Sequence, residues 1–285
     1  MMAAQSQIEI THRTPGKATP GTPGPVVVFD NVSVGFEGHP VLQDISFKVE
    51  PGETRIILGP AGCGKSVLMK LTNGLICPDD GAITVFDQRV DTTSELELYK
   101  LRERVGMVFQ ESALFDSLSV RDNVGYRLYE AGASAEEAEG RVLEALRFVE
   151  LEQAIDKFPS ELSGGMRRRV SIARAIITRP DLILYDSPTG GLDPITSTTI
   201  VELVMKQRDV SHTTSLLITH RMQDAFTLAM NRFNTRTGHM ERIPNDGIEA
   251  STRFMVLNEH KIVFDGSTLE LVHTQDPWLK EYLSE

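Results

Sequence analysis

A glycine-rich segment in the first quarter of the chain has the residue types and spacing that bind phosphate. Residues 59 to 66, GPAGCGKS, match the pattern G-x-x-x-x-G-K-[ST] and lie between a strand-like run and a helix-like run. Glycines let such a loop curl until its backbone N–H groups face the phosphates, and the helix that follows presents its positive end. Lys65 is then expected to reach the β- and γ-phosphates of ATP, and the Ser66 hydroxyl to bind Mg²⁺. The predicted nucleotide contacts in this loop are Gly59, Pro60, Ala61, Gly62, Cys63, Gly64, Lys65 and Ser66.

Two further polar residues end strand-like runs and suit a metal site. Asp186 ends LILYD, and we expect this strand to neighbour the strand before the glycine loop, so that its carboxylate holds Mg²⁺ through water. Gln110 closes VGMVFQ, from where it can reach the same metal and the attacking water. On its own, Gln110 would be interpreted as structural. The predicted Mg²⁺ ligands are therefore Ser66, Asp186 and Gln110.

The elements that position these residues alternate between strands and helices. Before the glycine loop come the strand-like runs VVVFDNVSVGF and DISFKVEPG, and after VGMVF a stretch at about 120 to 156 is rich in Ala, Glu and Leu at helical spacing. Beyond it the order is helix, strand, helix, strand, helix. This order predicts an α/β fold with a mostly parallel sheet covered on both faces.

The remaining segments set the predicted domain boundaries. Residues 1–24 are rich in Pro and Gly and are predicted to be a disordered tail, followed by one domain over 25–266. Residues 231–252 are polar and aperiodic, which predicts a solvated insertion or loop before two last strands, RFMVL and KIVF. The end of the chain, 267–285, is expected to form a short helical tail of two helices broken at Pro277.

Composition excludes several classes of function. A formal net charge of −11 and a pI near 5.2 make nucleic acid an unexpected partner. The two cysteines, Cys63 and Cys77, form neither a disulfide framework nor a zinc set and suit a reducing cytosol, and Cys63 is interpreted as a bystander in the loop. No apolar run approaches the roughly 18 residues of a membrane span. Any work at a membrane is therefore expected to need a separate spanning subunit.

The segment LSGGMRRR, residues 162–169, adds a family resemblance. Together with the glycine loop, Gln110, GLDP at 191–194 and LLITH ending in His220, it resembles the ATP-binding-cassette (ABC) ATPases over about residues 26–266. The resemblance implies a P-loop NTPase of the ABC type, with an antiparallel β subdomain and an inserted helical subdomain at about 111–161. It also implies a head-to-tail homodimer that closes over two ATP molecules, in which Ser163, Gly164 and Gly165 contact the γ-phosphate bound by the partner.

Other roles follow from the same resemblance. Phe36 matches the aromatic residue that stacks on adenine, with a buried core side chain as the alternative. Asp193 matches the acid that couples the two sites across the dimer. His220 matches the histidine that contacts the γ-phosphate, with an exposed helix cap as the alternative.

Ser187 departs from the family pattern. The family usually has a glutamate directly after the Mg²⁺-binding acid, where it orients or deprotonates the attacking water. Serine is too short and too weakly basic to replace it, and loss of a general base costs on the order of 10²- to 10⁴-fold in rate. The catalytic set is then Lys65, Gln110, Asp186, Ser187 and His220, and the sequence predicts ATP binding and dimer closure with slow hydrolysis. A catalytically weakened clamp that regulates or gates a partner is the alternative, and an engineered change that traps a closed state also fits the sequence.

The segment FQESALFDSLSVRDNV, with ELSGGMRRRVSIARAI and GLDPITS, narrows the resemblance to the ATPase of Mla-type lipid transporters linked to Mce proteins. It implies an integral, MlaE-like permease, a Mce-domain lipid-binding protein and phospholipid as cargo. Leu114 and Phe115 are candidates for the surface that grips the permease, although they could simply pack the helical lobe. The chain would then lie in the cytoplasm on the inner face of the plasma membrane and touch that membrane only through the permease. A polar solute importer, such as an amino-acid importer, is the other transport hypothesis.

Overall fold

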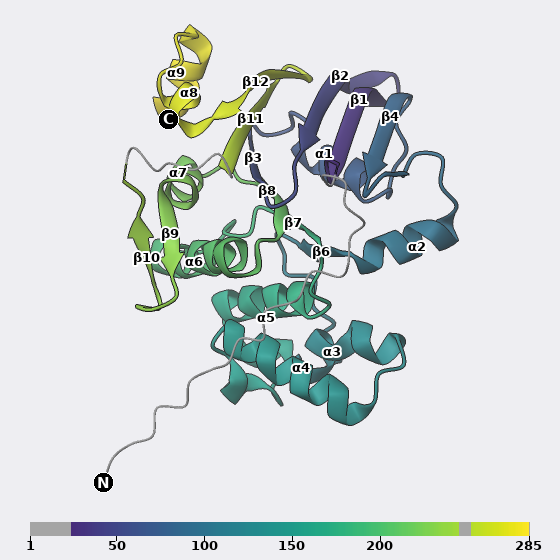
Figure 1. The fold of residues 1–285 in the computed structure, drawn as a ribbon, viewed down its shortest axis with the longest axis vertical. Helices are drawn as coiled ribbons and strands as arrows, with labels where there is room; N and C mark the ends of the chain where they lie inside the picture. Colours follow the sequence, from purple (N-terminus) through teal and green to yellow (C-terminus); the bar gives the residue numbers. More distant parts are fainter. Residues whose placement is uncertain (1–23, 245–251, 285) are drawn as a thin grey trace.

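The computed structural model describes residues 24–244 and 252–284, and its central element is a sheet in the order β12-β11-β3-β8-β7-β6. Its strands are β3 (Thr54–Leu58), β6 (Val105–Val108), β7 (Leu182–Asp186), β8 (Thr214–Ile218), β11 (Thr252–Asn258) and β12 (Lys261–Ser267). All neighbours pair in parallel except β11 and β12, which pair antiparallel. Figure 1 shows this sheet through the middle of the molecule.

The strand order corrects one expectation about Asp186. We expected β7, which ends at Asp186, to neighbour the strand before the glycine loop, but β8 lies between β7 and β3. Local sequence cannot fix this order, because each of these strands is an apolar run that fits any central position of a parallel sheet. Asp186 pairs in register with Ile218 of β8, and Ile218 pairs with Ile57 of β3.

The two faces of the sheet carry two different hydrophobic cores. Ile56 and Leu58 of β3 belong to the core formed with α5 (Gly164–Ile176), α6 (Pro194–Ser211) and α7 (Met222–Met230), whereas Ile57 belongs to the core formed with α1 (Lys65–Thr72). Successive residues of a strand point to opposite faces, so the helix after the glycine loop and α5 lie on opposite faces of the same sheet.

The second core is completed by an antiparallel sheet in the order β2-β1-β4-β5. Its strands are β1 (Val27–Phe36), β2 (His39–Val49), β4 (Asp80–Val85) and β5 (Gln88–Arg89). Stacked rings of Phe29 and Phe47, with centroids 4.6 Å apart, join β1 to β2 in its interior. This sheet confirms the predicted antiparallel β subdomain, and α2 (Glu95–Glu103) connects it to β6.

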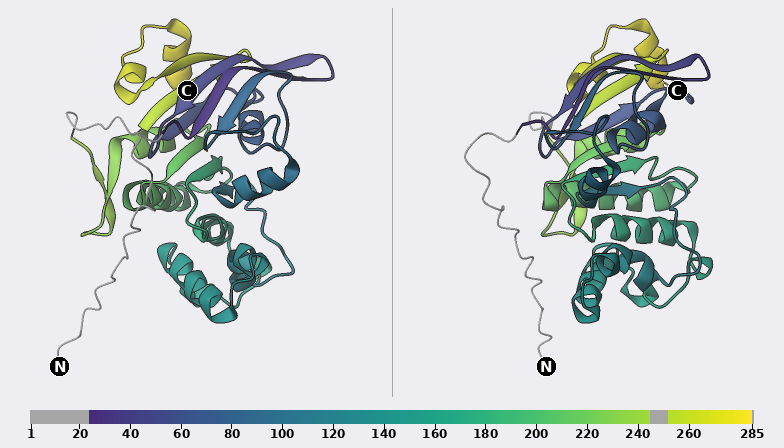
Figure 2. Two further views of the ribbon diagram at one scale, coloured as in Figure 1. Left: turned by 45° about the vertical axis from the view of Figure 1, so that its right-hand side comes forward. Right: turned by 90° about the vertical axis from the view of Figure 1, so that its right-hand side faces the viewer.

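The expected helical lobe lies below the central sheet in both views of Figure 2. It contains α3 (Val120–Glu130) and α4 (Ala135–Phe148), followed by short 3₁₀ turns at Glu152–Ala154 and Pro159–Glu161. Serine side chains cap both helices, because Ser119 accepts from the Asp122 N–H and Ser134 from the Glu137 N–H. The helical periodicity of residues 120 to 156 therefore predicted this part well.

Residues 231–242 correct the prediction of an aperiodic loop. They form a hairpin of β9 (Asn231–Asn234) and β10 (His239–Arg242), which Figure 1 shows beside α6. The Phe233 N–H donates to Asp209 at 2.6 Å and the Met240 N–H to Glu202 at 3.0 Å, so carboxylates of α6 hold both strands. The sequence did not predict this hairpin because its strands are polar and because α6, the helix that holds them, lies about 30 residues earlier in the chain. Residues 245–251 of the predicted insertion lie outside the described residues, as does the predicted tail apart from Gly24, and Thr252 at the end of the predicted insertion already begins β11.

The C-terminal segment forms the two expected short helices, α8 (Thr268–Val272) and α9 (Pro277–Ser284). Pro277 begins α9, where its missing N–H costs no helical hydrogen bond. Figure 1 shows both helices next to the end of the central sheet that carries β11 and β12.

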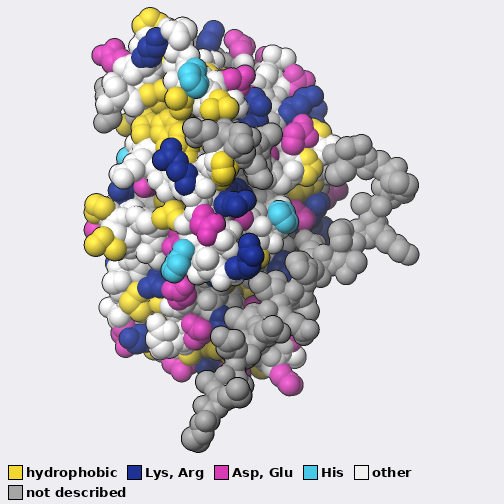
Figure 3. Space-filling model, turned by 60° about the vertical axis from the view of Figure 1, so that its left-hand side comes forward, with side chains coloured by type: hydrophobic (Ala, Val, Ile, Leu, Met, Phe, Trp, Pro, Cys, Tyr) yellow, Lys and Arg dark blue, Asp and Glu magenta, His cyan; other side chains and the backbone are white. Residues whose placement is uncertain are grey.

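Within residues 24–244 and 252–284, no helix has the length and apolar character needed to span a membrane. On the face shown in Figure 3, acidic and basic side chains alternate over most of the surface, with a hydrophobic patch toward the top.

Candidate functional site

The glycine loop follows β3 and ends at α1, as the sequence predicted. Gly64 is the N-cap of α1 and has φ of 98°, a left-handed conformation that L side chains rarely adopt. A Cβ atom at Gly64 would also lie 2.7 Å from the Leu42 side chain. Both constraints keep the loop curled tightly against β2, so that the first N–H groups of α1 remain available to an anion.

Lys65, the first residue of α1, folds back over the loop. Its ammonium donates to the carbonyl oxygens of Gly59 at 2.8 Å and Pro60 at 2.7 Å, and lies 3.5 Å from the buried Cys63 thiol. The side chain of the next residue, Ser66, is exposed. The ammonium is thus bonded to the loop itself, and the residue that follows Lys65 carries an exposed hydroxyl.

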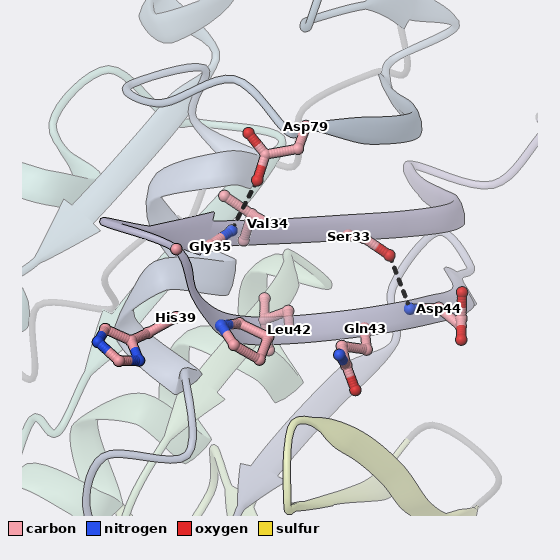
Figure 4. A pocket seen from close by; sticks show the side chains of 10 residues that line it. Ser33, Val34, Gly35, His39, Leu42, Gln43, Asp44 and Asp79 are labelled. Atoms are coloured by element: carbon pink, nitrogen blue, oxygen red, sulfur yellow. Dashed lines mark hydrogen bonds between the residues drawn. The ribbon is translucent and has the colours of Figure 1, made fainter.

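A hollow of about 650 Å³ lies along the hairpin of β1 and β2, next to this loop. Figure 4 shows its lining, including Leu42, which packs under Gly64, and the Gly35 N–H that donates to Asp79 at 2.7 Å. Phe36 ends β1 at the rim of this region and is 47% exposed. Its exposure rules out the buried-core alternative and leaves a ring face open to a flat partner.

The two other predicted metal ligands follow strands of the same sheet. Asp186 is the last residue of β7 and is only partly buried. Gln110 does not close β6 as we expected, because that strand ends at Val108 and Gln110 lies in the turn that follows. Its side chain packs on Gly190, where an added Cβ atom would lie 3.3 Å from the Gln110 Cγ.

Ser187 is held by its backbone more than by its side chain. It is only 7% exposed and has φ of 47°, in the left-handed region. Its N–H donates to the Ile218 carbonyl at 3.0 Å, and its carbonyl accepts from the Gly190 N–H at 2.9 Å. The backbone at position 187 is therefore fixed by contacts that do not depend on which side chain it carries.

Arg168 of α5 is a structural residue that the sequence reading missed. It is 4% exposed, and its guanidinium donates to the carbonyls of Ser187 at 3.1 Å, Gly190 at 3.4 Å and Gln110. Burial lowers the pKa of Arg168. A signal was present, because Arg168, Ser171, Ile172 and Ala175 follow the helical spacing of a buried stripe. One guanidinium thus ties together the two backbone turns around the predicted metal site, one at Gln110 and one at 187–190.

Replacing Arg168 with methionine is expected to destabilise the fold and disorder these segments. Three carbonyls lose a charged donor, and one hydrogen bond to a charged group is worth about 1.5 to 3 kcal/mol. We expect the free energy of unfolding in urea to fall by about 2 to 4 kcal/mol, allowing for partial replacement by water. Arg147→Met, at an exposed position on α4, is the control. An unchanged free energy of unfolding for Arg168→Met would show that the guanidinium does not hold the two turns together.

The segment LSGG begins α5 at an open end of the helix. The Ser163 hydroxyl accepts from the Met166 N–H at 3.2 Å, and both Ser163 and Gly164 are exposed. A Cβ atom at Gly165 would lie 2.4 Å from the Thr196 Cγ2, so only glycine allows α5 and α6 to approach this closely. The N–H groups of this helix end therefore face solvent, on the sheet face opposite to α1.

Asp193 and His220 are both exposed. Asp193 caps α6 by accepting from the Thr196 hydroxyl and from the Thr196 N–H at 3.0 Å, and these hydrogen bonds lower the pKa of Asp193. His220 follows β8 and precedes α7, outside any helical turn. The structure thus gives Asp193 a capping role and leaves the His220 ring open to a ligand.

One edge of the parallel sheet gathers most of the predicted residues. The glycine loop, Gln110, Asp186, Ser187 and His220 all follow the carboxyl ends of β3, β6, β7 and β8, and such ends meet at one edge of a parallel sheet. Ser163, Gly164 and Gly165 do not belong to this group. They lie at the start of α5, which packs on the sheet face opposite to α1.

The donor set at this edge fits magnesium. Hydroxyl, carboxylate and amide oxygens from Ser66, Asp186 and Gln110 are ligands that Mg²⁺ accepts, and Mg²⁺ usually takes only one or two protein carboxylates besides phosphate and water. Among the described residues there is no cluster of three or more His, Cys, Asp or Glu side chains that would suit zinc or calcium.

Comparison with known proteins agrees with this geometry. The family profile described as ABC transporter matches residues 42–190. The methionine import ATP-binding protein MetN 2 of Bacillus cereus is 42% identical over 201 residues, covering 69% of this chain and 59% of that protein. The chain therefore spans less than two thirds of that relative. The chloroplastic protein TRIGALACTOSYLDIACYLGLYCEROL 3 of Arabidopsis thaliana is 36% identical over 261 residues, covering 88% of this chain and 71% of that protein.

A solved structure gives the same result. The ATP-binding cassette MJ0796, in a dimeric post-hydrolysis state bound to ADP and Pi, matches with a TM-score of 0.70 and 27% identity, covering 85% of this chain and 98% of that one. This chain belongs to the ABC transporter family, and its fold is that of the family's ATP-binding domain.

Proposed function

We propose that this chain binds and hydrolyses ATP as the nucleotide-binding subunit of an ABC transporter. The observation that carries the proposal is the Lys65 ammonium, held 2.7 to 2.8 Å from two carbonyls of the glycine loop and beside the exposed Ser66. Phosphate oxygens would replace those carbonyls as the acceptors for Lys65, and the N–H groups at the start of α1 would face the same phosphates.

The other residues divide the remaining work. Bound Mg²⁺ neutralises charge on the phosphates, and Ser66, Asp186 and Gln110 are the residues that would hold it. Gln110, His220 and the backbone of Ser187 would position the attacking water and the γ-phosphate, while Phe36 would offer its ring to the adenine. Since no carboxylate follows Asp186, chemistry is slow compared with binding.

A second copy of the chain is expected to complete the site. Ser163, Gly164 and Gly165 begin a helix whose free N–H groups face solvent on the sheet face opposite to α1, so one chain cannot apply both to one nucleotide. A head-to-tail homodimer brings each helix end to the partner's γ-phosphate, and Asp193 lies one residue before α6 on that same surface. The dimeric state of the cassette MJ0796 supports this arrangement.

For the cargo, we propose phospholipid, moved with a Mla/Mce-type permease. The support is the extent of the match to the Arabidopsis protein named after a galactolipid, since it covers 88% of this chain. The match to the methionine importer subunit is closer in identity but covers 69%. That closer identity favours a second candidate, an importer of methionine or a similar amino acid.

Transport by the purified complex separates the two candidates. The tagged chain is purified with its permease and reconstituted into proteoliposomes, and ATP-dependent transfer of labelled phospholipid and uptake of labelled methionine are both measured. We expect ATP-dependent movement of phospholipid only. Methionine uptake without phospholipid transfer would replace the lipid proposal with the amino-acid importer.

The candidate contact with the permease is the exposed ring of Phe115. It is 45% exposed, its centroid lies 4.9 Å from that of Tyr126, and its backbone N–H and carbonyl are both bonded to the Asn123 side chain. Leu114, in contrast, is partly buried against the core that includes the helical lobe and α5. This burial agrees with the alternative that Leu114 packs the lobe. Phe115 is thus an apolar side chain on a fixed backbone, as an interface anchor requires.

Phe115→Asp is expected to weaken the complex with the permease. Truncating an interface anchor costs at least about 2 kcal/mol, so retention of the permease on the tagged chain should fall about 30-fold or more. MgATP affinity should not change. Val263→Asp, at a position of similar exposure on β12, is the control and should retain the permease. Full retention by Phe115→Asp would place the permease elsewhere.

A catalytically weakened clamp remains a second candidate for the activity, favoured by Ser187 alone. Steady-state release of phosphate by the complex with its permease distinguishes it, because a clamp binds MgATP and closes without turnover.

A further inference from the structure

Helix α9 is a docked part of the molecule. Leu279 is 3% exposed and belongs to the core that β3 forms with α5, α6 and α7. Trp278, Tyr282 and Leu283 pack against the same core. Asp276 starts the helix by accepting from the Leu279 N–H at 2.9 Å. A helix fixed at its start and along one face holds its side chains in defined places.

One of those side chains reaches the glycine loop. The Tyr282 hydroxyl accepts a hydrogen bond from the Gly59 N–H at 2.8 Å, across 223 positions of the chain. β3 ends at Leu58, which pairs with Val256 of β11, so the Gly59 N–H is the first donor beyond the ladder. A buried backbone donor needs a partner, and Tyr282 supplies it where the sheet no longer does.

Gly59 has little freedom to move. Its φ is 146°, and an added Cβ atom would lie 2.3 Å from the Leu257 carbonyl oxygen and 2.7 Å from the Cys63 Sγ. Its own carbonyl accepts from the Lys65 ammonium at 2.8 Å. Gly59 is therefore bonded to Tyr282 through its N–H and to Lys65 through its carbonyl.

We propose that Tyr282 is a positioning residue for the nucleotide site: it anchors Gly59, so that the loop keeps its curl when Lys65 exchanges loop carbonyls for phosphate oxygens. This inference rests on the proposed ATP binding. It makes α9 a part of the nucleotide site that the glycine-loop pattern does not contain.

The chain carries its own reporter for this contact. Trp278 is the single tryptophan, and its ring stacks on Tyr282 with centroids 5.2 Å apart and planes at 5°. A change at Gly59 that reaches Tyr282 alters the surroundings of the Trp278 ring. Trp278 emission therefore reports whether α9 keeps its place when Tyr282 is changed.

The test compares Tyr282→Phe with the wild type and with Tyr99→Phe, which removes the same hydroxyl from an exposed position on α2. MgATP affinity is measured by equilibrium dialysis with labelled ATP, and Trp278 emission is recorded in the same titration. Loss of one net hydrogen bond lowers affinity about 2- to 10-fold, so Tyr282→Phe should bind MgATP that much more weakly, whereas Tyr99→Phe should match the wild type. Nucleotide-free emission equal to that of the wild type, and a melting temperature lower by no more than about 4 °C, would show that α9 stays docked in Tyr282→Phe.

The outcomes separate this inference from the function on which it rests. Wild-type affinity in Tyr282→Phe overturns the role of Tyr282 while ATP binding stands. Failure of the wild type to bind MgATP in dialysis overturns the proposed function itself.

Discussion

Lys65→Ala is expected to lower the affinity for MgATP by about 30-fold or more. In the structure the Lys65 ammonium is the one charged group that donates to the glycine-loop carbonyls of Gly59 and Pro60 within the described residues. Removing a charged partner from a shielded site costs about 2 to 5 kcal/mol, and each 1.4 kcal/mol is a factor of ten in affinity. Equilibrium dialysis with labelled ATP measures the effect.

Lys70→Ala provides the matched control, because Lys70 is exposed on the same helix, α1. Its affinity for MgATP is expected to equal that of the wild type. Equal binding by Lys65→Ala and the wild type would remove the glycine loop from the nucleotide site.

Ser187→Glu is expected to raise ATP turnover by about 10²- to 10⁴-fold, the usual contribution of a positioned general base. The carbonyl of residue 187 accepts hydrogen bonds from Arg168 and Gly190, and its N–H donates to Ile218. These backbone contacts do not involve the side chain, so we expect the substitution to leave the backbone in place. Steady-state phosphate release by the complex with its permease is the measurement.

Ser187→Gln tests whether the gain comes from basicity. Glutamine has the shape of glutamate without its charge, so its turnover should stay near that of the wild type. An equal rise in both variants would show that the gain does not come from basicity. No rise in either variant would show that another group already activates the water.

Sequence predicted the parts of the site that depend on short-range pattern. The glycine loop, the strand before Asp186 and the helix after Ser163 each need only neighbours within a few residues, and all three lie where the motifs indicated. The fold class followed from the alternation of apolar runs. These features are local, so a single sequence contains them.

Gln110, which lies beyond the end of β6, was a local error of strand boundary, and the other misses are matters of long-range contact. The position of β8 between β3 and β7 depends on chain topology, and the hairpin 231–242 depends on carboxylates of α6. Tyr282 meets Gly59 only because α9 packs on the core. The burial of Arg168 could have been predicted in part, because Arg168 has the helical spacing of the buried residues of α5.

The nucleotide site could be assigned from the sequence, whereas the cargo could not. Residues that a nucleotide would touch form motifs, and the comparisons place the chain in the ABC transporter family. The cargo depends on the permease, so the choice between the phospholipid and methionine candidates needs the transport measurement.

The central claim is that MgATP joins two copies of this chain, with the glycine loop of one facing the LSGG helix of the other. Sedimentation equilibrium of the purified chain tests it directly, because slow hydrolysis without a glutamate at position 187 should let the closed state accumulate. The account predicts a shift from the monomer mass of 31.6 kDa to about twice that value with MgATP, and no shift for Lys65→Ala. A wild-type protein that stays at the monomer mass in saturating MgATP, with and without its permease, would contradict it.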